Sequence, residues 1–242
     1  MMKTFNGDFD LFLNKIKNSE HFSLSRWGDG ELMILEKHGI DIRNKGSGEF
    51  RYDPNMIEYE EVRNKLLESY SYVSDGYYIG IACQCCVGKE KYEYMKQKCG
   101  QNEEYLTWAN IFVNANHRRT ISELIPELNN HKVNIVVNKN SKIDGLSFNV
   151  NKVWYVGTDA WYSDYKLIDV LLKYINDNNI KNELFLFAAG PLANILTYEL
   201  WKNSDRENSY IDVGSILDPY LNLKITRGYH KGAPTLNKIC IW

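Results

Sequence analysis

Apolar residues along the chain fall into short runs of two kinds, which differ in their spacing. Apolar positions at helical spacing predict helices over 8–18, 31–38, 54–70, 103–114, 120–128, 165–176 and 192–202. Shorter apolar runs are typical of buried strands, and they lie at 22–27, 77–82, 132–137, 152–156, 183–189 and 210–213. Because strands alternate with helices, the pattern predicts an α/β fold with a mainly parallel sheet and helices on both faces.

Length and composition narrow the class of protein. We expect one domain over 1–242, because the chain contains no internal repeat or low-complexity linker. The absence of an export signal and the odd number of cysteines, 5, predict a cytoplasmic location with reduced thiols. No run approaches the roughly 20 apolar residues that span a bilayer, so any membrane contact would be peripheral. The net charge of -2 disfavours a nucleic-acid partner, and no oligomeric state is indicated.

Ligands of parallel α/β sheets bind beyond the carboxyl ends of the strands. The first such position reads SRWGDGEL, in which Asp29 and Glu31 flank Gly30. Two carboxylates on one loop can converge on Mg²⁺ or Mn²⁺, while Arg26 can hold a phosphate or orient an acid. Capping is the alternative, since Asp29 suits a helix N-cap and Glu31 favours the helix dipole.

Two later strand ends carry further candidate chemistry. The segment FLFAAGPLAN (185–194) is a buried strand, a Gly-Pro turn and a helix start, whose exposed amides can hold an anion. A plain strand-to-helix connection is the alternative. In YIDVGSILDPY (210–220), either Asp212 or Asp218 could deprotonate an acceptor hydroxyl, although the glycine turn could equally be structural.

Four segments, in this order, resemble the glycosyltransferases of the GT-D fold: SRWGDGEL (25–32), NIFVN (110–114), AAGPLANILTYEL (188–200) and IDVGSILDPY (211–220). The resemblance spans most of the chain and implies a Rossmann-like sheet. It implies transfer of a hexose from a nucleotide sugar, typically UDP-linked, to a hydroxyl of a glycan or glycoprotein acceptor. The acid-x-acid motif of that family matches Asp29 and Glu31, which would hold Mn²⁺ or Mg²⁺.

The same resemblance implies which residues contact the nucleotide sugar. They are Arg26, Gly28, Gly190, Pro191, Asn194 and Arg227. Arg227 and His230, in the tail TRGYH (226–230), could bind the diphosphate or merely cap the fold. The chain differs from some members near Ser215 and Pro219, where a histidine and an acid are expected. Asp212 and Asp218 therefore both stay candidates for the catalytic base.

Two other functions remain open. The turn YIDVGS is similar to the acid-and-glycine turn of S-adenosylmethionine-dependent methyltransferases, although that turn normally follows the first strand. A non-catalytic nucleotide- or glycan-binding module would bind the same ligands without turnover, and its affinity need not require metal. Thermal stabilisation of the protein by S-adenosylmethionine would identify a methyltransferase. Ligand binding without turnover would identify a binding module.

The cysteines allow a metal site or a redox pair, because Cys83, Cys85 and Cys86 are close in sequence. A structural zinc site needs about four ligands, however, and Cys99 is the one nearby addition. Small buried thiols are therefore the favoured interpretation.

Two further groups of side chains have a functional and a structural interpretation. The basic run 117–119 (HRR) could contact an acidic acceptor, but a solvated loop is favoured. Trp161 or Tyr162 could stack on a base or a sugar ring, although aromatic residues also fill cores.

Overall fold

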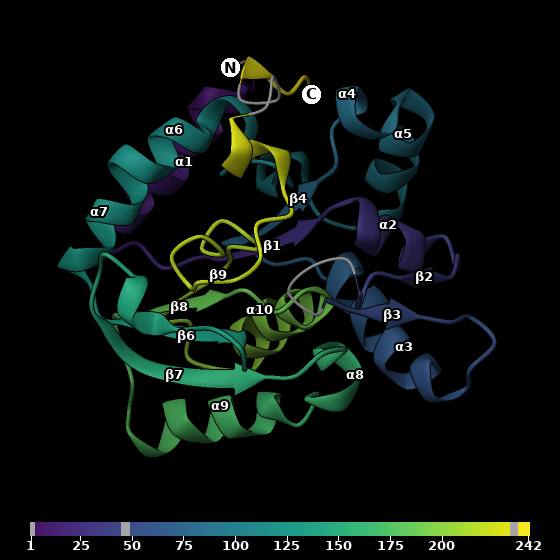
Figure 1. Ribbon diagram of the computed structural model, residues 1–242. Coiled ribbons are helices and arrows are strands. Elements are labelled where there is room, and N and C mark those ends of the chain that lie inside the picture. The colour runs from purple at the N-terminus through teal and green to yellow at the C-terminus, as the bar shows by residue number, and fades with distance from the viewer. Residues whose placement is uncertain (1–2, 45–48, 233–236) are drawn as a thin grey trace.

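A seven-stranded sheet forms the centre of the protein, and every strand pair in it is parallel (Figure 1). The computed structural model describes residues 3–44, 49–232 and 237–242. The strands are β1 (Ser23–Trp27), β4 (Tyr77–Ile81), β5 (Leu106–Trp108), β6 (Val133–Asn138), β7 (Val150–Val156), β8 (Leu184–Phe187) and β9 (Ser209–Asp212). Their order, β5-β4-β1-β9-β8-β6-β7, places the first and last strands of the chain side by side in the middle of the sheet.

Helices cover both faces of the sheet, as the alternation of strands and helices predicts (Figure 1). One face packs against α1 (Phe5–Lys17) and α7 (Ile125–Glu127), and α6 (His117–Arg119) precedes α7 in the chain. The other packs against α3 (Glu58–Ser71), α8 (Ala160–Ser163), α9 (Leu167–Asp177) and α10 (Pro191–Asn203). The α/β fold with a parallel sheet is therefore confirmed.

Shorter elements lie between the layers and around the carboxyl edge of the sheet. Three are α2 (Asp29–Leu35), α4 (Gln84–Val87) and α5 (Lys89–Lys98), and β2 (Ile40–Asp41) pairs antiparallel with β3 (Arg51–Tyr52). Single 3-10 or π turns occur at Glu103–Tyr105, Asn114–Asn116, Thr120–Leu124, Leu128–Asn130, Ile143–Gly145 and Gly228–Lys231. Within the described ranges, no helix combines the length and the apolar character needed to cross a membrane.

Two serines of β1 allow α10 to lie close to the sheet. The hydroxyl of Ser23 donates to the Thr197 carbonyl at 2.9 Å, and the Asn194 amide donates to the Ser25 hydroxyl at 3.0 Å. Residues 191–201 of α10 are all buried, so this helix is enclosed by protein on every side. These contacts fix the position of α10, and of the loop before it, against β1.

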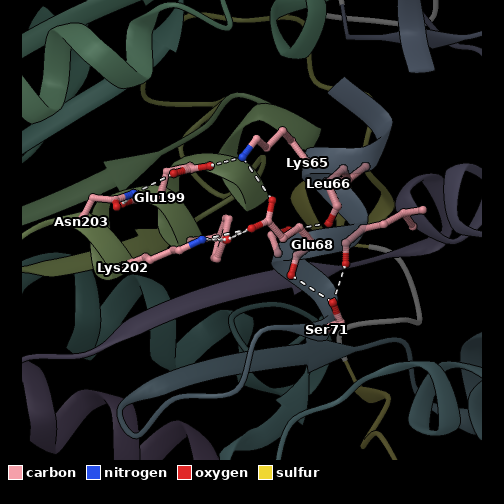
Figure 2. A network of polar contacts seen from close by, with 10 residues as sticks. Lys65, Leu66, Glu68, Ser71, Glu199, Lys202 and Asn203 are labelled. Carbon is pink, nitrogen blue, oxygen red and sulfur yellow. Dashed lines mark hydrogen bonds and ion pairs between the residues drawn. The ribbon is translucent and has the colours of Figure 1, made fainter. Parts of the chain in front are cut away.

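Polar contacts join α3 to α10 at the outer side of these helices (Figure 2). Lys65 contacts Glu68 at 3.1 Å and Glu199 at 3.5 Å, and Lys202 contacts Glu68 at 3.0 Å. Hydrogen bonds from Tyr198, and then from Lys202 and Lys65, lower the pKa of Glu68 to about 2. Because Lys65, Glu68 and Lys202 are partly exposed to solvent, the network sets the alignment of the two helices more than it adds to stability.

One expected helix is wrong. Residues 103–114 form a single 3-10 turn, the edge strand β5 and a non-helical turn. Leu106 pairs with Ile79 of β4, so sheet pairing overrides the local helical spacing. The helix α5 and the β2–β3 hairpin were not expected from the sequence.

Candidate active site

A cavity of about 980 Å³ opens along the carboxyl edge of the sheet. Six of the seven strands contribute a lining residue at or just after the carboxyl end, and β4 contributes one through α4, which follows it: Arg26, Ala109, Asn138, Val156, Ala188 and Asp212, with Cys86 from α4. The β2–β3 hairpin and the C-terminal segment complete the walls with Phe50, Arg227 and Tyr229. This volume is large enough for a nucleotide-sized ligand.

Arg26 lines the floor of this cavity and links neighbouring strands through its guanidinium. Its Nε donates to the Asp212 carbonyl at 2.8 Å, and its Nη1 donates to the Ala109 carbonyl at 2.9 Å. The guanidinium also lies 3.5 Å from the Asp212 carboxylate. Arg26 therefore ties β1 to β9 and to the end of β5, and these contacts fix the orientation of its guanidinium.

Asp212 is held from several sides. Its Oδ1 accepts from the Gly214 amide at 2.8 Å, and its Oδ2 accepts from the Arg26 amide at 3.2 Å. Burial raises the pKa of Asp212, and the charge of Arg26 and these amides oppose that rise. Because both carboxylate oxygens are engaged, Asp212 serves to position Arg26 and the following turn.

Gly214→Ala is expected to lower the free energy of unfolding by about 2–4 kcal/mol. Gly214 has φ +52°, and an added Cβ would lie 2.0 Å from Nη2 of Arg26. The side chain would force Arg26 away from Asp212 and Ala109. Urea unfolding measures the loss. The matched control is Gly232→Ala, which shares a positive φ, +72°, but meets no described atom within 4 Å. It should lose about 1 kcal/mol, and equal losses in both variants would contradict the packing role of Gly214.

Asp29 and Glu31 lie at the start of α2, where they face the cavity. The N-cap is Gly28 rather than Asp29, and Oε2 of Glu31 accepts from the Gly28 amide at 3.0 Å. No hydrogen bond to the Asp29 carboxylate occurs among the described residues, and that side chain is exposed. One oxygen of Glu31 thus caps the helix, while the other oxygen and Asp29 remain available to a ligand.

The pKa of Glu31 rises to about 7. Burial is the largest cause, and the negative charges of Asp212 and Asp29 add to it. Part of the Glu31 side chain is accessible, but that part opens on the cavity rather than on bulk solvent. An acid in this environment favours a proton or a cation beside it.

Phe50 joins the two loops that frame this acidic corner. An added Cβ on Gly30 would lie 2.9 Å from the Phe50 ring, and one on Gly190 would lie 3.4 Å from it. The hairpin is held in place by Asp159, whose carboxylate accepts from the Arg51 amide at 3.0 Å and from the Tyr59 hydroxyl at 2.6 Å. Gly30 therefore makes room for the aromatic ring, whereas Gly190 is favoured by its positive φ of +57°.

Asp218 lies deeper in the same cavity and is 5% exposed. Burial raises its pKa to about 7, the charge of Arg227 lowers it, and the charge of Glu49 raises it. No protein hydrogen bond to its carboxylate occurs within the described part of the chain. Arg227 meanwhile contacts Glu49 at 3.0 Å, which joins the C-terminal segment to the hairpin. Among the described residues, Asp218 thus offers the cavity a buried carboxylate that accepts no hydrogen bond from the protein.

The Gly-Pro turn contributes less to the lining than the sequence suggests. Gly190 lines the cavity at φ +57°, but neither Pro191 nor Asn194 does so. The Asn194 amide donates to the Ser25 hydroxyl and to the Arg26 carbonyl, both at 3.0 Å, and the residue is fully buried. The structure therefore gives Asn194 a positioning role beneath Arg26 in place of ligand contact.

The resemblance implies a histidine near Ser215, and in the structure His230 lies beside Ser215. The ring of His230 bonds the Ser215 carbonyl at 2.8 Å, and the Ser215 hydroxyl pairs with the Tyr229 hydroxyl. Tyr229 lines the cavity, and the His117 ring lies 5.3 Å from its ring. This aromatic cluster fixes the C-terminal segment near the mouth of the cavity.

Several lining residues were missed from the sequence. Glu49 and Phe50 lie in a stretch that reads as a polar loop, and Lys91 belongs to the unexpected helix α5. The alternation of Phe50 and Tyr52 about Arg51 was the local signal for the hairpin.

The aromatic and basic candidates lie outside the cavity lining. Trp161 is fully buried and stacks on Tyr59 at a centroid distance of 5.5 Å, so it fills the core and is unavailable to a base or sugar. Tyr162 is 43% exposed but does not line the cavity either. Arg119 pairs with Asp10 and Glu123 at the surface, whereas His117 is buried, so the run 117–119 is only partly solvated.

Three solved structures are similar to this chain. One is described as a new glycosyltransferase (DUF1792) from Streptococcus sanguinis, with 17% identity over 96% of this chain and 85% of that one, and a TM-score of 0.61. A selenomethionine-substituted structure of domain of unknown function 1792 has 18% identity, coverage of 93% and 81%, and a TM-score of 0.60. A third, described as showing that this highly conserved domain has a distinct glycosyltransferase fold, has 18% identity, the same coverage and a TM-score of 0.59.

No family model matches the chain, and no curated protein matches it significantly. The relation therefore rests on the arrangement of the elements, which agrees over nearly the whole length. The chain has the α/β fold of the DUF1792 domain, the fold described for those structures as a distinct glycosyltransferase fold.

Proposed function

We propose that this protein is a metal-dependent glycosyltransferase, which moves a hexose from a UDP-linked sugar to a hydroxyl of a glycan or glycoprotein. The observation that carries the proposal is the pair of acids at the end of β1. Asp29 and Glu31 face a cavity of about 980 Å³, and the pKa of Glu31 is raised to about 7. The shared fold of the structures described as glycosyltransferases supports the same function.

The acidic corner suits Mn²⁺ or Mg²⁺. A carboxylate environment that raises the pKa of Glu31 is relieved by a cation, and hard divalent ions prefer oxygen ligands. Asp29 and the free oxygen of Glu31 would hold the ion. When bound, the metal would neutralise the charge that develops on the departing diphosphate.

The remaining residues divide the other tasks. Gly28 and Gly190 leave backbone exposed at the cavity wall, and the Arg227 guanidinium at the cavity rim can pair with a phosphate. Arg26 and Asp212 hold the floor in place through their mutual contacts. Asp218, with its free carboxylate, is the better candidate for the base that removes a proton from the acceptor hydroxyl.

The methyltransferase alternative has less support. In that alternative the acid of YIDVGS binds a ligand hydroxyl, whereas both oxygens of Asp212 accept from backbone amides. The binding-module alternative differs from the proposal in turnover and is an outcome of the test.

Titration of UDP into the protein tests the proposal. We expect binding by calorimetry in the presence of Mn²⁺, and at least about tenfold weaker binding without added metal or in the Asp29→Asn/Glu31→Gln variant. Equal binding with and without metal would contradict the metal site. Metal-dependent binding with no release of sugar from any UDP-hexose and acceptor would favour a non-catalytic module.

A further inference from the structure

Four of the five cysteines converge at one corner of the cavity wall, although one comes from the far end of the chain. Cys83 precedes α4, Cys85 and Cys86 lie within α4, and Cys240 lies in the described residues 237–242. The four Sγ atoms all lie within 4.8 Å of one another. The sequence interpretation as small buried thiols therefore does not hold for Cys85 and Cys86, which are exposed.

This spacing suits one tetrahedral metal ion. Zinc–thiolate bonds of about 2.3 Å place the sulfurs of a tetrahedral site about 3.8 Å apart. The thiols of Cys83 and Cys85 are 3.2 Å apart, so small side-chain rotations would open the cluster around an ion. Four thiolates favour Zn²⁺ over the hard cations that carboxylates hold.

The surroundings are those of a thiolate cluster. The ammonium of Lys238 lies 3.3 Å from the Cys86 sulfur and donates to the Cys85 carbonyl at 2.7 Å. Side-chain amides add N–H···S contacts of 3.3 Å, from Asn110 to Cys86 and from Asn114 to Cys240. These donors offset the excess negative charge that four thiolates would give to a divalent ion.

We infer that Cys83, Cys85, Cys86 and Cys240 form a structural Zn²⁺ site that fastens residues 237–242 to the cavity wall. Four protein ligands leave no open position on the ion, so the site has no role in the chemistry. Its consequence is mechanical, because Cys86 lines the cavity and Cys240 belongs to the described residues 237–242. Trp242 anchors the end of that segment beside Trp108, at a centroid distance of 4.9 Å.

Metal analysis of the protein tests this inference. The protein is purified without a histidine tag, chelator or metal resin, and under a reductant. We expect about one zinc per chain in the wild type, and loss of most of it in Cys85→Ser, Cys86→Ser and Cys240→Ser. Cys99→Ser is the matched control, because Cys99 lies outside the cluster, and it should keep its zinc.

Reconstitution with Co²⁺ reports the ligands directly. The wild type and Cys99→Ser should show thiolate-to-cobalt charge transfer with intense visible bands, and the three cluster variants should lose them. Lys238→Ala leaves all four sulfurs in place and should weaken zinc binding about 10–100-fold. The two exposed cysteines can be changed without disturbing the core, so their variants remain informative if Cys240→Ser fails to fold.

Two results would overturn the inference. One is wild-type protein without zinc that also gives no cobalt spectrum under a reductant, in which case disulfides in a peptide map would explain the cluster. The other is iron in place of zinc. Asp29→Asn/Glu31→Gln should keep its zinc while losing UDP-linked Mn²⁺ binding, so this site and the proposed active site can fail separately.

Discussion

Glu31→Gln is expected to abolish sugar transfer and to make the protein more stable at pH 8. The substitution removes a metal ligand, and a loss of several kcal/mol of charge stabilisation lowers kcat/KM by about 100-fold or more. Glutamine keeps an oxygen that can accept from the Gly28 amide, so the helix cap survives. Initial rates with a UDP-hexose and chemical unfolding measure the two effects.

The gain in stability follows from the raised pKa of Glu31. Its ordinary value is 4.5 and its folded value is about 7, so the folded state binds the proton more tightly. The contribution to folding is complete below pH 4.5 and is lost as the pH rises through about 7. Because the side chain faces an open cavity, we expect a gain of about 1–2 kcal/mol at pH 8, and none near pH 4.5.

Glu60→Gln is the control for this prediction. It makes the same substitution at an exposed position of α3 that lies outside the cavity lining. It should change neither activity nor stability by a measurable amount. Unchanged activity in Glu31→Gln would remove Glu31 from the mechanism, and equal stability at both pH values would show that its carboxylate ionises normally.

Asp218→Asn is expected to lower kcat by about 10²–10⁴-fold while KM for the sugar donor changes little. The substitution removes the buried carboxylate that is free to accept a proton, but it keeps the size of the side chain. Steady-state rates with the donor and the acceptor varied separately distinguish kcat from KM. Asp144→Asn, at an exposed position outside the cavity, should behave as the wild type.

The pH profile tests the same residue. Activity should rise with pH through about 7, because Asp218 accepts a proton only when it is ionised. Ionisation of Glu31 would also make activity rise with pH. Saturating metal should move the rise caused by Glu31 to lower pH, while the rise caused by Asp218 should stay near pH 7. If the whole rise of activity with pH shifts with metal concentration, Glu31 alone causes it.

The variant Asp212→Asn tests whether Asp212 is the catalytic base or a positioning residue. An amide offers one oxygen where the carboxylate accepts from two backbone amides, so one donor at the floor of the cavity loses its partner. We expect this variant to lose stability and activity together, unlike Asp218→Asn. Retained stability with a loss of kcat alone would instead favour Asp212 as the base.

Much of the fold could be predicted from local sequence. The apolar runs at β1, β4, β6, β7, β8 and β9 mark strands buried on both faces, and helical spacing marks α1, α9 and α10. These signals are reliable because a strand or a helix needs a partner surface along its own length. The strand β5 was missed because its three residues become a strand by pairing with β4.

The candidate site was only partly visible in the same way. Asp29, Glu31 and Asp218 stand out because they follow short apolar runs, and the carboxyl ends of parallel strands meet at one edge. Sequence alone left Asp212 and Asp218 equal, since both are acids in one turn. Hydrogen bonding separates them, and it depends on Arg26 and Gly214 at close range.

The sequence by itself determined the parallel α/β sheet, the acidic pair after the first strand and the glycines around it. The tertiary structure alone decided that Phe50 closes the acidic corner, that Asn194 lies under the floor, and that Cys240 joins three distant cysteines. Periodicity reports which face of an element is buried, and that information is local. Contacts between distant segments depend on how the whole chain packs, because closing a long loop costs nearly the same free energy for many partners and leaves local sequence unable to choose among them.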